Sequence, residues 1–322
     1  MSAVEAIVVI DQLRKLYARQ GEWRRKETIR AVDGVSLTIR RGETLGLVGE
    51  SGSGKSTTGQ MAAGLLPATS GTIRFGGEEI GGLRGNKAKE MRKHIQYVFQ
   101  DPYTSLNPQH RVAELIEEPL RIHRLGRGAE RRERVEAMMS RVGLGPSFAR
   151  RFPRELSGGQ RQRIGIARAL MLSPQFVVLD EPVSALDVSV QSQILNLLKE
   201  LQEHDSLTYL FISHDLNVVH YMSDRVAVMY SGKIVELAEV SKLYEQPLHP
   251  YTQALVSAAP GNLRGEGRER IVLQGEASVS SHGLMEGCSF YSRCRSAKPR
   301  CRVESPELRQ VDSEHAVSCH FA

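Results

Sequence analysis

The sequence predicts an α/β fold around a buried parallel sheet, and three observations support that prediction. Apolar segments at residues 45–48, 176–179 and 208–213 each have the length and composition of a buried strand. Polar residues of the kinds that bind phosphate or water follow each of these segments directly. Segments with a helical apolar period separate them, for example after residue 160. Strands that alternate with helices are typical of parallel sheets with a site at the strand ends.

The composition fits a soluble globular protein. The chain has 322 residues, enough for two domains or for one large domain with an appendage. Hydrophobic residues make up 40% and charged residues 25%, which argues against a disordered or membrane-embedded chain. No apolar run approaches the roughly 20 residues that cross a bilayer, so we expect the chain to stay in the cytoplasm. The apolar stretch after Glu5 is expected to form an edge strand rather than a signal peptide.

The net charge of +6 raises nucleic acid or an anionic membrane surface as partners. Arginine is dense at residues 22–30 and 123–141. In the second segment Arg alternates with Glu at helical spacing, which favours the alternative of a solvated helix face.

The first of the three strands leads into the most informative motif. Residues 49–56 read GESGSGKS and fit the phosphate-binding pattern G-x-x-x-x-G-K-[ST], with a strand before and a helix after. Glycines let backbone N–H groups converge on phosphate oxygens, and the helix start adds its positive dipole end. Lys55 is predicted to reach the β and γ phosphates and Ser56 to bind Mg²⁺. The flanking elements argue against a chance Gly/Ser-rich turn. The predicted nucleotide contacts are Gly49, Ser51, Gly52, Ser53, Gly54, Lys55, Ser56 and Thr57.

The other two strands end in candidate catalytic residues. Asp180 closes the strand at residues 176–179 and is predicted to support Mg²⁺. Glu181, one residue on, is predicted to orient or deprotonate the attacking water. His214 follows the third strand and is predicted to donate to the γ-phosphate, with a structural histidine as the alternative.

A second anion-binding element lies between these strands. Ser157, Gly158 and Gly159 form a tight turn, and a helical apolar period begins at Gln160. A Gly-rich turn that opens a helix binds anions for the same reason as the first motif. Two such elements in one chain require an explanation.

These motifs, in this order, resemble the ATP-binding-cassette ATPases: GESGSGKST, LSGGQ, FVVLDE, SALD and the His of ISHD. The resemblance implies a P-loop cassette with a RecA-like core, an antiparallel β subdomain and a helical subdomain. It also implies head-to-tail pairs, in which Ser157, Gly158, Gly159 and Gln160 cap the γ-phosphate held by the other chain. Gln100 is similar to the glutamine that touches metal and water. The resemblance further implies that Asp187 of SALD joins the nucleotide site and that Tyr17 stacks on adenine, with a plain surface tyrosine as the alternative.

Longer stretches make the resemblance more specific. The stretch YEQPLHPYTQALVSAAP resembles the ATPases of dipeptide, oligopeptide and nickel importers. Within that branch, VFQDPYTSLNP and RVAVMYSGKIVE are most similar to the F-type ATPase subunit. The implied function is ATP hydrolysis that energises peptide uptake. The implied partners are a homologous second ATPase, two membrane-spanning permease subunits and an extracytoplasmic substrate-binding protein. The chain would lie at the cytoplasmic face of the cell membrane, held by the permease, and no nucleic acid is expected.

Other functions remain open at this point. The cargo can equally be a nickel complex or a glutathione-like peptide, because near-identical ATPases of this branch serve them all. A soluble ATPase of the same family acting on nucleic acid or ribosomes is the alternative from another class. A nucleotide-binding regulator without turnover would lack the base or the signature, and this chain has both.

The chain is expected to divide into a nucleotide-binding domain at residues 1–255, with a helical subdomain at about 101–170, and a C-terminal region at 256–322. Residues 225–238 alternate around a Ser-Gly turn and predict a hairpin that closes the cassette. Residues 260–270 predict a Gly- and Arg-rich linker.

All four cysteines lie in the C-terminal region, spaced C-x5-C-x6-C-x17-C. Cytoplasmic thiols stay reduced, so the spacing suggests a metal site, either zinc or an iron–sulfur cluster, with four free cysteines as the alternative. Members of the resembled branch hold a 4Fe–4S cluster, which implies that role for Cys288, Cys294, Cys301 and Cys319. Arg293, Arg295 and Arg302 would offset the thiolate charge. The expected task is structural, because nothing in the sequence places this region near the nucleotide.

Overall fold

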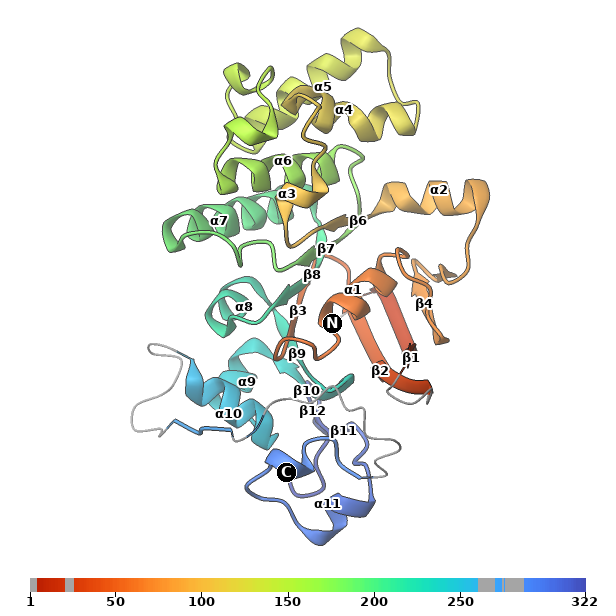
Figure 1. The fold of residues 1–322 in the computed structure, drawn as a ribbon, viewed down its shortest axis with the longest axis vertical. Coiled ribbons are helices and arrows are strands. Elements are labelled where there is room, and N and C mark those ends of the chain that lie inside the picture. Colours follow the sequence, from red (N-terminus) through yellow and green to blue (C-terminus); the bar gives the residue numbers. More distant parts are fainter. Residues whose placement is uncertain (1–4, 21–25, 260–269, 274, 276–286) are drawn as a thin grey trace. The chain divides into compact units, whose positions relative to one another are not determined.

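The computed structural model describes residues 5–20, 26–259, 270–273, 275 and 287–322. The chain forms two compact units, one made of residues 1–81 and 211–322 and the other of residues 82–210. Strands alternate with helices through much of the chain (Figure 1), which confirms the predicted α/β class.

The first unit contains a four-stranded antiparallel sheet in the order β2-β1-β4-β5. The predicted edge strand is β1, and this prediction is wrong, because β1 pairs with β2 on one side and with β4 on the other. The strands are β1 (Ala6–Gln20), β2 (Lys26–Arg40), β4 (Ser70–Phe75) and β5 (Glu78–Glu79).

A second sheet in the same unit carries the phosphate-binding motif. β3 pairs in parallel with β9, and β9, β10, β12 and β11 continue the sheet as antiparallel neighbours. The predicted hairpin is β9 and β10, whose turn places Ser231 and Gly232 at φ 45° and 83°, as a type I′ turn requires. The strands are β3 (Thr44–Val48), β9 (Arg225–Tyr230), β10 (Lys233–Glu239), β11 (Arg309–Asp312) and β12 (His315–Val317).

The C-terminal region therefore adds strands to the sheet of the cassette. The register places Glu236 of β10 opposite Val317 of β12. The fully buried Glu236 accepts a hydrogen bond from the ring of His315 at 2.7 Å and two from the backbone N–H groups of Leu248 and His249, both at 2.8 Å. This network anchors the region to its neighbours in the fold.

Helices cover these strands within the first unit. α8 packs on β3, and α9 packs on β9 and β10. The helices are α1 (Lys55–Ala62), α8 (Leu216–Met222), α9 (Val240–Glu245), α10 (Pro250–Ala258) and α11 (Pro299–Val303).

The second unit joins a pair of parallel strands to a group of helices. Its strands are β6 (Ile95–Val98) and β7 (Phe176–Asp180), with Val98 opposite Leu179. α6 packs against α3, α4 and α7. β8 (Thr208–Ser213) carries the chain back to the first unit. The helices are α2 (Gly85–His94), α3 (Pro102–Ser105), α4 (Val112–Ile122), α5 (Gly128–Arg141), α6 (Gly158–Leu170) and α7 (Val188–Asp205).

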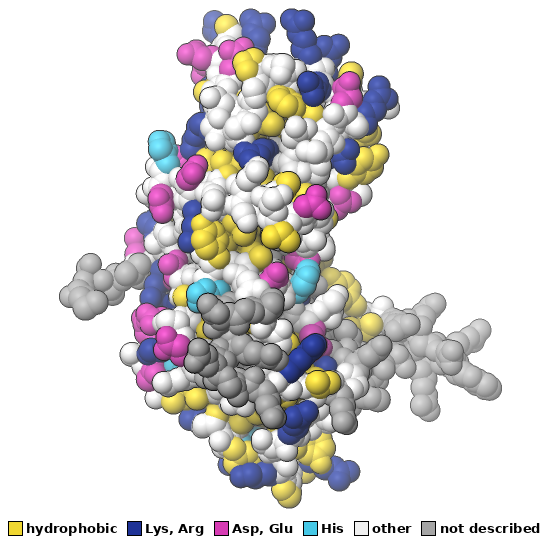
Figure 2. Space-filling view, turned by 90° about the vertical axis from the view of Figure 1, so that its left-hand side faces the viewer, with side chains coloured by type: hydrophobic (Ala, Val, Ile, Leu, Met, Phe, Trp, Pro, Cys, Tyr) yellow, Lys and Arg dark blue, Asp and Glu magenta, His cyan; other side chains and the backbone are white. Residues whose placement is uncertain are grey.

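The division after residue 255 and the helical subdomain at about 101–170 stay predictions. Residues 260–269 of the predicted linker and residues 22–25 of the basic segment lie outside the described residues. No helix in the described ranges combines the length and the hydropathy that crossing a membrane requires. On the face shown in Figure 2, acidic side chains are interspersed with the basic ones.

Candidate active site

The phosphate-binding loop lies between β3, which is buried along its whole length, and α1. A Cβ atom on Gly54 would lie 2.2 Å from the carbonyl oxygen of Ala31, and the backbone there has φ 105°. A Cβ atom on Gly49 would lie 2.1 Å from the carbonyl oxygen of Met229. Glycine is required at both positions because backbone from β2 and β9 approaches the loop too closely for any side chain.

Polar groups inside the loop suit an anion. Lys55 is 5% exposed, and its ammonium donates to the carbonyl oxygens of Gly49 at 2.8 Å and Glu50 at 2.9 Å. Ser53 is also 5% exposed, and its hydroxyl has no hydrogen-bond partner among the described residues. Gly54 caps α1 without a side-chain bond. A buried cation, an unpartnered hydroxyl and a helix start without a side-chain cap fit the phosphates of ATP.

Glu50 of the loop has a partner that the sequence did not indicate. Its carboxylate accepts hydrogen bonds from both terminal nitrogens of Arg293, at 2.9 and 3.1 Å. Nothing in the sequence placed the cysteine-bearing region near the nucleotide loop, and this contact joins the two. The two residues are 243 positions apart, so no local pattern joins them.

The second unit brings the predicted base together with the predicted glutamine. Because β6 and β7 run parallel, the residues that follow them emerge at the same edge of the sheet. Gln100 donates from Nε2 to Oε2 of Glu181 at 2.9 Å. Glu181 has φ 45°, a left-handed conformation that costs a residue with a side chain about 1–2 kcal/mol. Strain of this kind at a strand-end carboxylate is typical of a functional residue.

Asp180, the predicted Mg²⁺ ligand, is the last residue of β7 and is 5% exposed. Its carboxylate accepts a hydrogen bond from the hydroxyl of Tyr97 at 2.6 Å. A buried carboxylate held in this way is a hard oxygen donor, the type of ligand that Mg²⁺ prefers.

The predicted tight turn at Ser157–Gly159 is wrong, because Gly158 and Gly159 are already the first residues of α6. Ser157 is the N-cap of α6, and its hydroxyl accepts a hydrogen bond from the N–H of Gln160 at 3.3 Å. The side-chain oxygen of Gln160 in turn accepts from the N–H of Ser157 at 3.0 Å, which completes a capping box. Ser157 and Gly158 are exposed, so the start of α6 presents polar groups to the solvent.

Three further predicted residues keep their roles as predictions. His214 is exposed and follows β8. Asp187 is exposed and is the N-cap of α7. Tyr17 lies on β1, is 41% exposed, and has the ammonium of Lys15 5.3 Å from its ring centroid. The loop residues, Tyr17 and His214 belong to the first unit, and the other predicted site residues of the cassette belong to the second.

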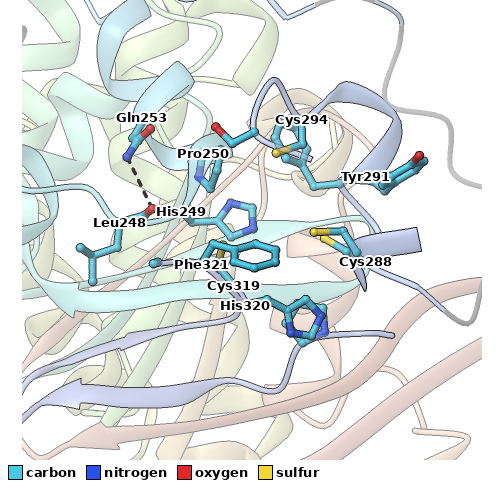
Figure 3. Close-up of a pocket in the computed structure, with 15 residues that line it drawn as sticks. Leu248, His249, Pro250, Gln253, Cys288, Tyr291, Cys294, Cys319, His320 and Phe321 are labelled. Atoms are coloured by element: carbon cyan, nitrogen blue, oxygen red, sulfur yellow. Dashed lines mark hydrogen bonds between the residues drawn. The ribbon is translucent and has the colours of Figure 1, made fainter. Parts of the chain in front are cut away.

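All four cysteines line one cavity of about 140 Å³ in the C-terminal region (Figure 3). His249, Phe290, Tyr291 and His320 also line it. The thiols are free, and burial raises the pKa of Cys288 and of Cys294, which favours the protonated thiol over the thiolate that binds metals.

The fold and the loop define a P-loop ATPase, and the comparisons identify its family. Residues 32–184 match the family described as ABC transporter, and residues 235–301 match the one described as oligopeptide/dipeptide transporter, C-terminal region. The chain belongs to the ABC-transporter ATPases and, within them, to the oligopeptide and dipeptide transporter group.

Two relatives match over almost their whole length. The oligopeptide transport ATP-binding protein AppF of Bacillus subtilis is 52% identical over 98% of both chains. The di/tripeptide transport ATP-binding protein DppF of Pseudomonas aeruginosa is 44% identical over 99% of this chain and 98% of the relative. These matches confirm the predicted ABC ATPase.

Solved structures agree with this fold. The ATP-binding cassette MJ0796, in a dimeric post-hydrolysis state bound to ADP and phosphate, has a TM-score of 0.66 and 33% identity. The match covers 72% of this chain and 98% of that one. The ABC cassette fold that the resemblance implied is therefore confirmed.

The predicted 4Fe–4S cluster is wrong. Within the described ranges, no group of three or more His, Cys, Asp or Glu side chains is placed to hold a metal ion, which also argues against zinc. Neither family description and neither relative's name mentions a cluster. Four thiols can line a cavity without converging on one point, and the cysteine spacing does not distinguish these two arrangements. Free cysteines, the remaining alternative, agree with the structure.

Proposed function

We propose that this chain is the ATP-hydrolysing subunit of an ABC importer for peptides. The observation that carries the proposal is the combination of a phosphate loop with a C-terminal region, residues 235–301, of the oligopeptide/dipeptide transporter type. The names of the relatives, which refer to oligopeptide and di/tripeptide transport, support a peptide cargo. A nickel complex or a glutathione-like peptide is the alternative cargo.

The loop residues bind the phosphates of ATP in this proposal. Lys55 exchanges its two carbonyl partners for the β and γ phosphates, and Ser53 and the N–H groups of Gly49 and residues 51–57 complete the contacts. Tyr17 stacks on the adenine, and Asp187 joins the site. Ser56, Gln100 and Asp180 hold Mg²⁺, which offsets phosphate charge when bound.

Hydrolysis depends on the carboxylate of Glu181. Gln100 holds that carboxylate at 2.9 Å, so it is oriented before the substrate arrives. A water oxygen attacks the γ-phosphorus while the bond to the β-phosphate oxygen breaks, and the water proton passes to Glu181. His214 donates to the γ-phosphate. The products are ADP and phosphate.

The exposed start of α6 is assigned to a second ATPase subunit. Ser157, Gly158, Gly159 and Gln160 cap the γ-phosphate in the loop of a homologous partner, and the partner's signature does the same for this chain. The dimeric state of the solved cassette supports a pair of ATPase subunits, and the head-to-tail arrangement of that pair is part of the proposal. This assignment explains two anion-binding elements in one chain.

The remaining partners are two membrane-spanning permease subunits and an extracytoplasmic substrate-binding protein. The chain lies peripherally at the cytoplasmic face of the cell membrane and is held there by the permease. The alternative of a soluble ATPase that acts on nucleic acid or ribosomes rests on the net charge of +6 alone.

Affinity purification of the tagged full chain from its own cells tests the proposal. We expect recovery of a homologous ATPase and two permease subunits from the membrane fraction, with ATPase activity that rises when peptide-loaded binding protein is added. Co-purification with ribosomes or nucleic acid, and without permease subunits, would contradict it. The Lys55→Ala chain is the matched control, because it should assemble normally and hydrolyse no ATP.

A further inference from the structure

The contact between Arg293 and Glu50 joins the C-terminal region to the phosphate-binding loop. Arg293 ends the short 3₁₀ helix η5 (Tyr291–Arg293), next to Cys294. Its side chain is 8% exposed and that of Glu50 is 29% exposed. Two parallel N–H···O bonds of 2.9 and 3.1 Å form the bidentate geometry that fixes a carboxylate most firmly.

Every polar group of Glu50 has a partner outside the strand that leads into the loop. Its N–H donates to the hydroxyl of Tyr251 on α10 at 2.9 Å, and its carbonyl oxygen accepts from Lys55. Tyr251 is fully buried, and burial raises the pKa of its hydroxyl, which therefore stays protonated. The main chain of Glu50 is thus held by the cassette, and its carboxylate is held by the C-terminal region.

A neighbouring aromatic residue fixes the segment that carries Arg293. Phe290 is 1% exposed, and its ring centroid lies 5.1 Å from that of Tyr230 and 5.5 Å from that of Tyr251. The guanidinium carbon of Arg293 lies 5.9 Å from the ring centroid of Tyr230. Tyr230 is the last residue of β9, the strand that packs beside the loop. The segment that carries Arg293 therefore packs against a residue of the buried sheet.

The charge of Glu50 explains why the loop needs this partner. A carboxylate in a phosphate-binding loop repels the phosphates that the loop binds, and the repulsion is strong where water is excluded. We propose that Arg293 is a positioning residue for ATP binding: it neutralises the Glu50 carboxylate and holds it in one place beside the phosphates. The C-terminal region thereby completes the ATP site of its own chain.

The alternative is a purely structural role, in which the pair of Arg293 and Glu50 only anchors the C-terminal region. Other contacts already do this, because β12 pairs with β10, His315 bonds to Glu236, and Phe290 packs among buried aromatic rings. An anchor also has no reason to use a loop carboxylate. The exposed pair of Arg300 and Glu304 in the same region shows that a bidentate Arg–Glu pair forms there without touching the cassette.

The test measures affinity for MgATP, with a fluorescent ATP analogue, on the full-length chain and four variants. Arg293→Ala should weaken binding about fivefold to tenfold, the order expected for one uncompensated charge in a partly buried site. Glu50→Gln should bind ATP at least as tightly as the native chain, because it removes the repelling charge. The double variant should return to within about twofold of the native affinity. Arg300→Ala, the matched control, should bind ATP normally.

Salt and thermal melting separate the two explanations. The loss in Arg293→Ala should shrink near 1 M salt, where the screening length is about 3 Å. If Glu50→Gln weakens binding as much as Arg293→Ala, or if the double variant is not rescued, the pair is only an anchor and the proposal fails. Normal affinity in Arg293→Ala would also overturn it. If Arg293→Ala melts early, Arg293→Lys, which keeps the charge, should stay within about threefold. The proposal rests on ATP binding by this chain, so loss of the peptide-import proposal would leave these outcomes unchanged.

Discussion

The starts of α1 and α6, the two predicted anion-binding elements, differ in how they are capped. At the start of α1, the loop is buried, the cap is a glycine without a side-chain bond, and Lys55 lies inside it. At the start of α6, Ser157 and Gln160 cap each other, and Ser157 is exposed. At the first, the buried cation and the unpartnered Ser53 hydroxyl come from the chain's own loop. The second is a preformed surface, and in our proposal a partner's nucleotide covers it.

The largest expected effect is a loss of ATP hydrolysis without a loss of ATP binding. Glu181→Gln keeps the shape and the hydrogen bond to Gln100 but cannot accept a proton. ATP hydrolysis by the assembled complex should fall about 10²- to 10⁴-fold, the usual contribution of a general base, while ATP binding persists. Phosphate release and nucleotide binding are the measurements. Glu203→Gln, an exposed carboxylate on α7, should have no effect, and near-normal hydrolysis by Glu181→Gln would remove the role assigned to it.

The next effect concerns the start of α1. Lys55→Ala removes two charge-assisted hydrogen bonds to phosphate, at about 1.5 kcal/mol each, so ATP affinity should fall about 100-fold. Equilibrium binding of MgATP to the single subunit measures this. Lys87→Ala, an exposed lysine on α2, is the control. Affinity within a few-fold of native would show that the loop does not bind ATP through Lys55.

At the start of α6 we expect the opposite pattern, in which hydrolysis falls but ATP binding to the chain's own loop persists. Ser157→Arg places a bulky cation on this exposed helix start, so hydrolysis by the paired ATPases should fall at least about tenfold. ATP binding to this chain's own loop should stay within about twofold. Ser192→Arg, an exposed serine on α7, is the matched control. If Ser157→Arg abolishes binding at its own loop, the contrast between the two helix starts does not hold.

The smallest effect is an acid sensitivity near the support of the loop. Burial lowers the pKa of His249 to about 3, from an ordinary value of about 6.5. Between these values the unfolded chain binds a proton that the folded chain does not. The contribution of neutral His249 to the free energy of unfolding is therefore fully present above about pH 6.5. It is lost as the pH falls toward 3, by up to about 1.4 kcal/mol per pH unit.

Urea unfolding at pH 7.5, 6 and 5 measures this slope. His249→Gln should flatten it, whereas His110→Gln, at a histidine outside this buried site, should leave it unchanged. Equal slopes in the native chain and His249→Gln would assign the acid sensitivity to other groups.

Local patterns were sufficient for much of the site. The phosphate loop, Asp180 and Glu181 were predictable because strand, glycine and carboxylate follow one another within a few residues. The capping box at Ser157 was equally local. Gln100 was assigned from resemblance, and the parallel pairing of β6 with β7 gives the physical reason for its contact with Glu181.

Features that depend on distant residues could not be predicted in this way. The pairing of β12 with β10 and the bond between Arg293 and Glu50 join parts of the chain with no shared motif. The cysteine spacing suggested a metal centre, and that prediction was wrong. Spacing gives the order of the cysteines along the chain, but it does not say whether their thiols converge in space. The edge position of β1 was wrong because β4, more than 50 residues later in the chain, pairs with Val8–Arg14 on the side opposite β2.

The separation of Glu50 from Arg293 also fixes an order of events during synthesis. A ribosome that adds about 5–20 residues per second needs roughly 12 to 50 s to pass through the 243 positions between them. During that interval the nascent chain carries a phosphate loop whose carboxylate has no counter-charge. The Arg293 that neutralises it is added only after these 243 positions. The loop is thus translated well before the residue that neutralises its carboxylate.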